Sequence, residues 1–166
     1  VPDYGLPMDL VYALIQVESS GNPYAWNPEP RYRYFWDVSQ SKPFRFITTR
    51  EIGNVCPPKD FRCLAGDRDQ EWWAQQASWG LMQVMGAVAR EYGYIGHYLT
   101  ELVNPVVNLT YGCTKLKAEL IWAHGDVRAA LAAYNGGRQG NAPGGPLRNA
   151  DYADKVLSRV EAEAGL

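Results

Sequence analysis

Residues 7–23 read PMDLVYALIQVESSGNP and have the features of one amphipathic helix. The apolar side chains recur at helical spacing and form one stripe, made of Leu10, Val11, Leu14 and Ile15. Pro7 is tolerated in a first helical turn. Gly21 and Pro23 are stop signals, so we expect the helix to end near residue 20.

One carboxylate, Glu18, continues this apolar stripe in the last helical turn. Burial disfavours the charged form of a carboxyl group, and so does the partial negative charge of a helix C-terminus. The helix dipole supplies about 0.3–1 kcal/mol, whereas raising a Glu pKa to about 6 takes roughly 2–3 kcal/mol. Glu18 is therefore a candidate general acid if desolvation provides most of the shift. On this stretch alone, a Glu that turns to solvent or pairs with an Arg is the simpler interpretation.

The composition is that of one globular domain with a hydrophobic core: 166 residues, 46% hydrophobic and 20% charged. A net charge of −2 argues against a nucleic-acid-binding surface, and no apolar run approaches the length of a membrane span. No His or Cys cluster has the spacing of zinc ligands, so we expect no metal site. We also expect no cofactor. Aromatic residues reach 13%, which suits either a sugar-stacking groove or an aromatic-rich core.

An aromatic-rich segment follows the first helix, at about residues 24–78, and contains all four Phe. Residue alternation in 31–38 (RYRYFWDV) and 43–49 (PFRFITT), around a turn-like SQSK, predicts a β-hairpin. A structureless loop this long would be unusual in a compact domain, so we expect the segment to pack on its own aromatic side chains. Farther along it, Asp69 is a predicted cap of a short helix.

The rest of the chain has helical patterns. Residues 78–93 show helical apolar spacing, and Asn104, Asp126 and Asn149 each precede a further helical pattern as a predicted N-cap. There are no internal repeats and no linker. We therefore expect a single domain, residues 1–166, of the mainly helical α+β class, with a small β-hairpin region inserted after the first helix.

Four short pieces stand in order along the chain: ESSGNP, GLMQVM, AAYNGG and DYADKV. In this order they resemble the soluble lytic transglycosylases and goose-type lysozymes, a glycoside hydrolase family 23-like group that cleaves the glycan strands of peptidoglycan. The resemblance implies a lysozyme-like fold with a groove between lobes, and Glu18 as catalytic acid and base. The substrate-binding residues that it implies are Ser19, Gly80, Leu81, Met82, Gln83, Met85, Tyr134, Asn135 and Tyr152.

Several of these residues have an alternative role in the core. Met82 and Met85 are equally typical of core positions, and Tyr134 is also typical of a core aromatic with a satisfied hydroxyl group. A buried Gln83 amide would need partners, which a sugar N-acetyl group provides. The segment at about 24–78 makes the connection between the Glu and GLMQ several times longer than is usual in the family. It either forms a lip over one end of the groove or packs away from it.

The resemblance implies cleavage between MurNAc and GlcNAc by a single carboxylate, with 1,6-anhydroMurNAc ends as products. The alternative is hydrolysis, as in a goose-type lysozyme or a chitinase-like relative, which needs a second acid to activate water. The candidate second acids are Asp67, Asp69 and Glu71, with Asp37 weaker. A non-catalytic glycan-binding module is a third hypothesis, against which an intact Glu18 argues.

The implied substrate determines the expected partner and location. We expect a monomer that acts on peptidoglycan glycan strands in the periplasm, outside the cell or in a phage particle. Because disulfides persist in such places, the spacing of Cys56 and Cys63 predicts a disulfide between them, with Cys113 as a buried thiol.

Overall fold

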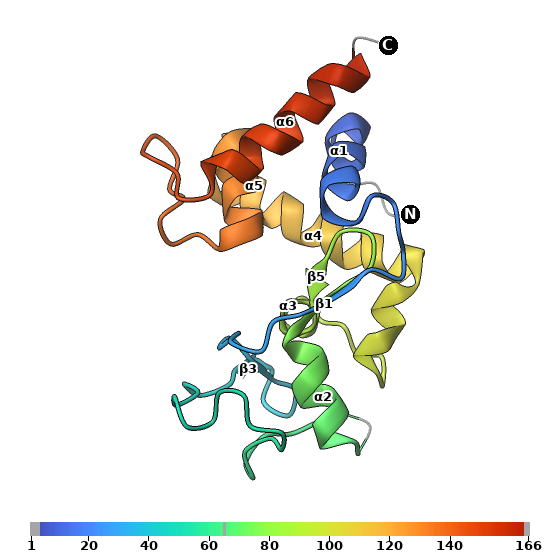
Figure 1. Ribbon diagram of the computed structural model, residues 1–166, viewed down its shortest axis with the longest axis vertical. Helices are drawn as coiled ribbons and strands as arrows, with labels where there is room; N and C mark the ends of the chain where they lie inside the picture. The colour runs from blue at the N-terminus through green and yellow to red at the C-terminus, as the bar shows by residue number, and fades with distance from the viewer. Residues whose placement is uncertain (1–3, 65, 165–166) are drawn as a thin grey trace. The chain divides into compact units, whose positions relative to one another are not determined.

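The computed structural model describes residues 4–64 and 66–164, and its architecture is shown in Figure 1. It is mainly helical with a few short antiparallel strands, so the predicted α+β class is confirmed. Contacts between residues divide the chain into two compact units. The first combines both ends of the chain, up to residue 21 and from residue 112, and the second comprises residues 22–111.

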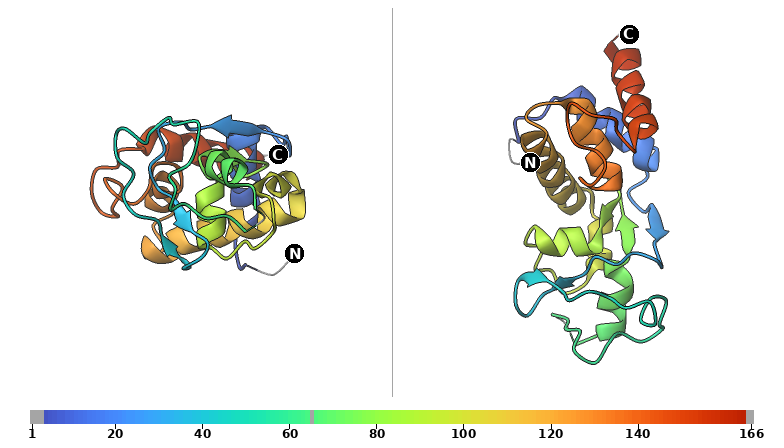
Figure 2. Two further views of the ribbon diagram at one scale, coloured as in Figure 1. Left: turned by 90° about the horizontal axis from the view of Figure 1, so that it is seen from below. Right: turned by 90° about the vertical axis from the view of Figure 1, so that its left-hand side faces the viewer.

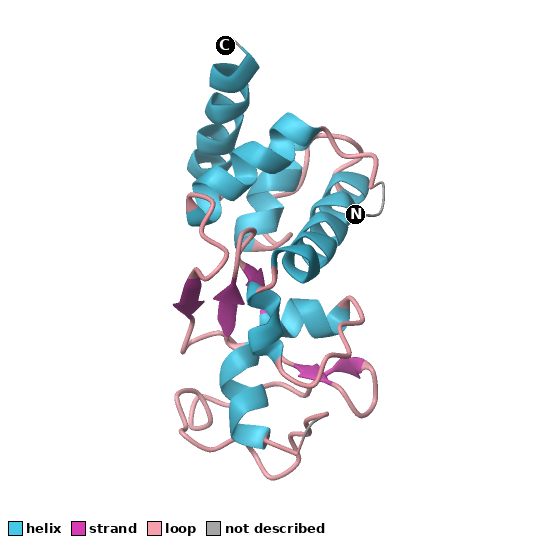
Figure 3. Cartoon of the chain, turned by 90° about the vertical axis from the view of Figure 1, so that its right-hand side faces the viewer, coloured by secondary structure: helices cyan, strands magenta, loops and turns pink. Residues whose placement is uncertain are grey.

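The first unit is helical. It contains α1 (Met8–Ser19), α5 (Val127–Gly136), α6 (Ala150–Ala164) and the part of α4 (Pro105–Trp122) from residue 112 onward. Helix α6 packs on both α1 and α5, which are labelled beside it in Figure 1. Figure 3 shows the helices of the chain in cyan and its strands in magenta. Most of the predicted stripe of α1 is buried, namely Leu10, Val11 and Leu14, whereas Ile15 is half-buried.

Helix ends in this unit follow the capping rules in part. Helix α1 ends at Ser19, as predicted, and Ser20 has left-handed backbone geometry that lets its N–H bond Gln16 O. Asp126 caps α5 by accepting from Ala129 N, also as predicted. Asn149 directly precedes α6 and its backbone O accepts from Ala153 N at 3.3 Å, so it occupies the predicted N-cap position, but among the described residues its side chain does not bond the first turn. Its side chain bonds those of Asn135 and Asn141 instead.

The second unit is built on a three-stranded antiparallel sheet in the order β1-β4-β5. Its strands are β1 (Trp26–Pro28), β4 (Ala77–Trp79) and β5 (Val84–Met85), with Trp26 opposite Trp79 and Ser78 opposite Met85. The helix predicted for residues 78–93 is therefore wrong over its first half. Only α3 (Gly86–Glu91) is helical, because residues 80–83 form the turn between β4 and β5.

Two residues of this turn have backbone angles that end regular structure. Gly80 has φ +69° and Gln83 has φ +46°. A Cβ atom at Gly80 would lie 2.7 Å from Leu102 O, so the position requires glycine.

Helix α4 begins as predicted. Asn104 caps it, since Asn104 Oδ1 accepts from Val106 N at 3.0 Å.

The aromatic segment forms the predicted hairpin, but a shorter one. Strands β2 (Trp36–Asp37) and β3 (Lys42–Pro43) pair over two residues each (Figure 2). The segment packs on its own aromatic side chains, as predicted, and forms a buried cluster. Its members are Phe35, Ile47, Phe61 and Trp72, with the Phe35 and Trp72 rings stacked at 4.2 Å.

Helix α2 (Arg68–Gln75) completes this unit together with the short η1 (Leu99–Val103). The cap of α2 is Asp67, which accepts from Gln70 N, so the prediction of Asp69 is two residues late.

The predicted Cys56–Cys63 disulfide is absent. Cys56 is exposed and Cys63 half-buried as thiols, while Cys113 is a buried thiol as predicted. An ion-pair network holds this loop region instead, since Arg45 bonds both Glu51 and Asp60.

None of the helices among the described residues combines the length and hydropathy of a membrane span.

Candidate active site

The central residue of the candidate site is Glu18, in the last turn of α1. Its carboxyl group is half-buried, and Tyr152 Oη–H donates a hydrogen bond to Glu18 Oε1. Tyr152 lies in the first turn of α6, the helix that packs on α1. Residues 134 positions apart in the sequence are thus brought together by one helix–helix contact.

The electrostatics of Glu18 favour a retained proton. Burial raises the pKa of its carboxyl group above the ordinary value. The Tyr152 hydrogen bond and the charges of Lys115 and Lys155 oppose this, but desolvation dominates. The pKa of Tyr152 is also raised, by burial and by the nearby Glu18, so its hydroxyl group stays a donor at neutral pH.

Tyr134 and Lys115 form a second contact in the same unit. Tyr134 is buried on α5, and Lys115 Nζ lies 4.0 Å from the centroid of its ring. Lys115 Nζ also donates to Tyr134 O near the C-terminal end of α5, where a cation is favourable. Sequence reasoning missed Lys115, because a single Lys next to an apolar helical stripe is a common surface pattern.

The two remaining predicted residues of this unit are engaged locally. Asn135 is exposed, and its Oδ1 accepts from Asn149 Nδ2 at 2.9 Å. Ser19 Oγ donates to Ile15 O at 3.2 Å, within α1. The structure therefore brings Glu18 directly to Tyr152, while Asn135 connects the end of α5 to the start of α6.

Residues 80–83, the GLMQ turn, belong to the second unit. Gln83 Oε1 accepts from Ser78 Oγ at 2.8 Å, and its Nε2 donates to Gly80 O at 3.0 Å and Ala25 O at 3.2 Å. The amide thus has protein partners on both of its ends. The expectation that it needs a sugar N-acetyl group is wrong, because this amide fastens the turn to β4 and to the chain before β1.

Met82 is fully buried, which supports its alternative role as a core residue. Its N–H donates to Asn108 Oδ1 at 2.8 Å, and Asn108 Nδ2 donates to Trp79 O and Leu102 O. Leu81 and Met85 are half-buried. Asn108 therefore fixes the turn, and it was not among the residues predicted from the sequence. The available signal for such a role was an amide on an apolar helix face, because a buried amide needs hydrogen-bond partners.

Comparison with known proteins identifies the family. The chain matches the transglycosylase SLT domain over residues 2–155. It belongs to the SLT family. No curated protein and no solved structure matches the chain. The SLT domain is a lysozyme-like domain, so the fold resemblance is confirmed.

Membership of the SLT family also supports a general function. The family has a lytic transglycosylase-type function and acts on peptidoglycan, which lies outside the cytoplasm. Among the described residues of this SLT domain, no group of three His, Cys, Asp or Glu could hold a metal ion.

The candidate second acids of this SLT domain lie in its second unit, and they differ in burial and in the groups that they bond. Asp67 caps α2, and Asp69 is exposed in the first turn of that helix. Glu71 is buried in an ion pair with Arg90. Asp37 is buried as well and accepts hydrogen bonds from the residues of the β2–β3 turn.

The raised pKa of Glu18 predicts that Glu18→Gln stabilises the SLT domain at neutral pH. The folded pKa lies above the unfolded one, so stability falls as the pH rises from the unfolded value through the folded value. Gln carries no charge, and its Oε1 can still accept from Tyr152. We expect a higher Tm than wild type at pH 7, and a difference that shrinks as the pH falls below the ordinary value of 4.5. Equal Tm values at pH 7 in thermal denaturation would contradict the desolvation of Glu18.

Proposed function

We propose that this SLT domain is a lytic transglycosylase that cleaves the MurNAc–GlcNAc bond of peptidoglycan and leaves 1,6-anhydroMurNAc ends. Glu18 acts first as the acid and then as the base. The observation that carries the proposal is the half-buried Glu18 carboxyl group, whose pKa is raised by burial and whose Oε1 accepts from Tyr152.

The first step is protonation of the leaving group. Among the described residues, only Tyr152 hydrogen-bonds the Glu18 carboxyl group, at Oε1, so Oε2 can carry the proton. Glu18 gives this proton to the glycosidic oxygen, and the bond from the MurNAc anomeric carbon to that oxygen breaks with its electron pair on oxygen. The MurNAc N-acetyl oxygen stabilises the cationic carbon, as in substrate-assisted glycosidases.

The second step closes the ring. Glu18 is now a carboxylate, stabilised by the Tyr152 hydrogen bond and by the charges of Lys115 and Lys155. It accepts the proton of the MurNAc 6-hydroxyl group while that oxygen bonds the anomeric carbon. The nucleophile belongs to the same sugar, so its effective concentration is high. The step restores protonated Glu18 and consumes no water.

Tyr152 is proposed as the positioning residue for Glu18. Its hydrogen bond favours the ionised carboxylate, so Tyr152→Phe should raise the pKa of Glu18 further. Because the first step needs protonated Glu18, the alkaline limb of the pH–rate profile should move to higher pH. The measurement is kcat against pH on purified peptidoglycan, with Tyr12→Phe as control, an exposed Tyr of α1. An unmoved alkaline limb in Tyr152→Phe would remove Tyr152 from the mechanism.

The products should carry anhydro ends. Met85 follows Val84, whereas the goose-type lysozymes that this sequence resembles have an acid at the corresponding position. A Met cannot deprotonate water. Glu71 is unsuited to that task because Arg90 holds it in a buried ion pair. Mass spectrometry of muropeptides should give fragments one water lighter than hydrolytic products, and chitin oligomers should stay uncleaved. Chiefly reducing ends, lost in Asp67→Asn, would replace this proposal with a lysozyme reaction.

The location and remaining contacts are proposed with the reaction. The enzyme works as a monomer in the periplasm, outside the cell or in a phage particle. Tyr134 and Asn135 of the first unit are proposed to contact the bound glycan.

A further inference from the structure

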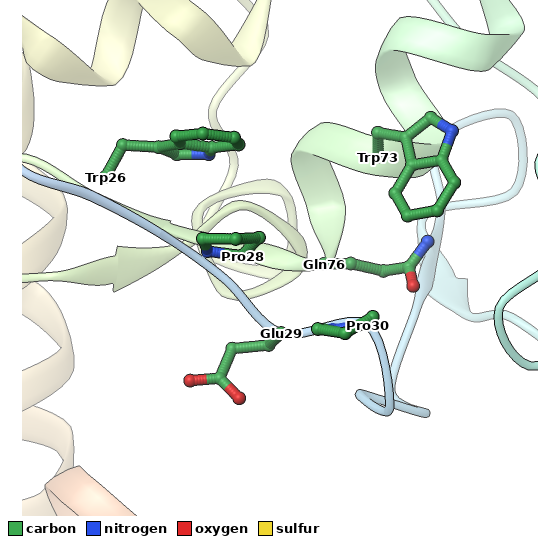
Figure 4. Close-up of a pocket in the computed structure, with 6 residues that line it drawn as sticks. All are labelled: Trp26, Pro28, Glu29, Pro30, Trp73 and Gln76. Atoms are coloured by element: carbon green, nitrogen blue, oxygen red, sulfur yellow. The ribbon is translucent and has the colours of Figure 1, made fainter.

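A cavity outside the Glu18 cluster lies within the second unit. Its volume is about 460 Å³, within the range of small-molecule sites. Figure 4 shows Trp26 and Pro28 on one side and Trp73 on the other, with Gln76 between them. The full lining is Trp26, Pro28, Glu29, Pro30, Trp73 and Gln76. All six residues fall in the aromatic segment at about residues 24–78.

The two indoles are exposed and yet fixed. Trp26 is 58% and Trp73 38% exposed, although large aromatic side chains are usually buried. Trp26 rests on Trp79, with ring centroids 6.0 Å apart. Trp73 Nε1 donates to Val55 O at 3.0 Å. Both rings therefore present an apolar face without needing to reorganise when a ligand binds.

Main-chain bonds fix the two walls against each other. Glu29 N donates to Gln76 O at 2.7 Å, which ties the chain after β1 to the end of α2. The Gln76 amide is held as well, because its Nε2 donates to Trp72 O. The site is thus preformed by elements of a single unit.

The chemistry of the lining selects the ligand. Indole and proline faces suit the apolar face of a pyranose ring, and the Glu29 carboxylate can accept hydrogen bonds from hydroxyl or amide groups. Glu29 is the sole charged residue among the six, and it is acidic. A free carboxylate of the peptide attached to MurNAc would be repelled by Glu29, whereas neutral GlcNAc would not.

We propose that this cavity is an accessory site that binds a GlcNAc residue of the glycan strand by stacking on Trp26 and Trp73. The identity of the sugar rests on the proposed function. The site increases affinity for long strands and takes no part in the bond cleavage.

The test uses tetra-N-acetylchitotetraose, a neutral GlcNAc oligomer that we expect not to be cleaved. On titration into the full ¹⁵N-labelled chain, the indole N–H signals of Trp26 and Trp73 should shift. Binding should weaken about tenfold in Trp73→Ala, the size of a central aromatic contact. The matched control is Phe46→Ala, which removes an aromatic of the same unit that is 73% exposed.

Three results would overturn the inference. They are shifts confined to residues outside the cavity, equal affinity of Trp73→Ala and wild type, or a cavity that responds to a proline-rich peptide and not to the sugar. The wild-type shift map does not depend on whether a variant folds. If cleavage still depends on Glu18 but the indole N–H signals of Trp26 and Trp73 do not shift, only this inference fails. If cleavage does not depend on Glu18, the proposed function fails instead.

Discussion

Glu18→Gln should abolish the cleavage of peptidoglycan. Loss of a general acid costs a factor of about 10² to 10⁴ in rate, and the loss here should be larger because the same carboxyl group is also the base. The Gln amide cannot donate a proton to the glycosidic oxygen or accept one from the 6-hydroxyl group. The measurement is the initial rate of turbidity loss of a peptidoglycan suspension, together with the yield of anhydro muropeptides.

The matched control for this variant is Glu161→Gln, an exposed carboxylate of the same unit. It should cleave like wild type. Glu18→Gln keeps the shape and the Tyr152 partner of the original side chain, so it should still sediment with peptidoglycan. Near-normal turnover by Glu18→Gln would defeat the assignment, and equal inactivity of wild type would favour a glycan-binding module.

Arg90→Met should produce the largest loss of stability. Arg90 Nε and Nη2 bond the two carboxylate oxygens of Glu71 at 2.9 and 2.8 Å, and both side chains are 1% exposed. Arg90 Nη1 also donates to Tyr94 O and Gly96 O. Removing one member of such a pair leaves a buried charge without a partner, which costs about 3–5 kcal/mol. For a chain of this size that lowers Tm by roughly 6–20 °C.

An exposed ion pair provides the control. Arg128 Nε bonds Asp154 Oδ1 at 2.6 Å, but both side chains are about half exposed. Water and salt already screen this pair, so Arg128→Met should change Tm little. Thermal denaturation of both variants in the same buffer tests the difference. Similar small shifts for Arg90→Met and Arg128→Met would show that the Glu71–Arg90 pair does not hold α2 to α3.

The sequence by itself was sufficient for features that depend on neighbouring residues. The helix that carries Glu18, its end near residue 20 and the cap of α5 by Asp126 are set by local spacing and hydrogen bonding within one turn. The family followed from short motifs in order, and the match over residues 2–155 confirms it. Glu18 was recognisable because a carboxylate on an apolar stripe is anomalous at a helix end.

The sequence misled where a local pattern competed with longer-range pairing. Residues 78–93 have helical apolar spacing, but β4 pairs with both β1 and β5, and residues 80–83 turn between strands. Backbone pairing with a strand some fifty residues away leaves no trace in the period of the side chains. For the same reason the roles of Gln83 and Met82 became clear only with their partners Ser78 and Asn108.

Tertiary structure alone decided the chemistry available to Glu18. The sequence predicts where this carboxyl group lies on α1, but its pKa depends on desolvation and on groups from other helices. Tyr152 of α6 supplies the hydrogen bond, and Lys115 of α4 supplies a charge. Glu71, another candidate acid in the sequence, is held in the fold by a buried ion pair with Arg90. Sequence spacing sets which face of an element a side chain occupies, whereas the packing of distant elements sets its surroundings and therefore its proton affinity.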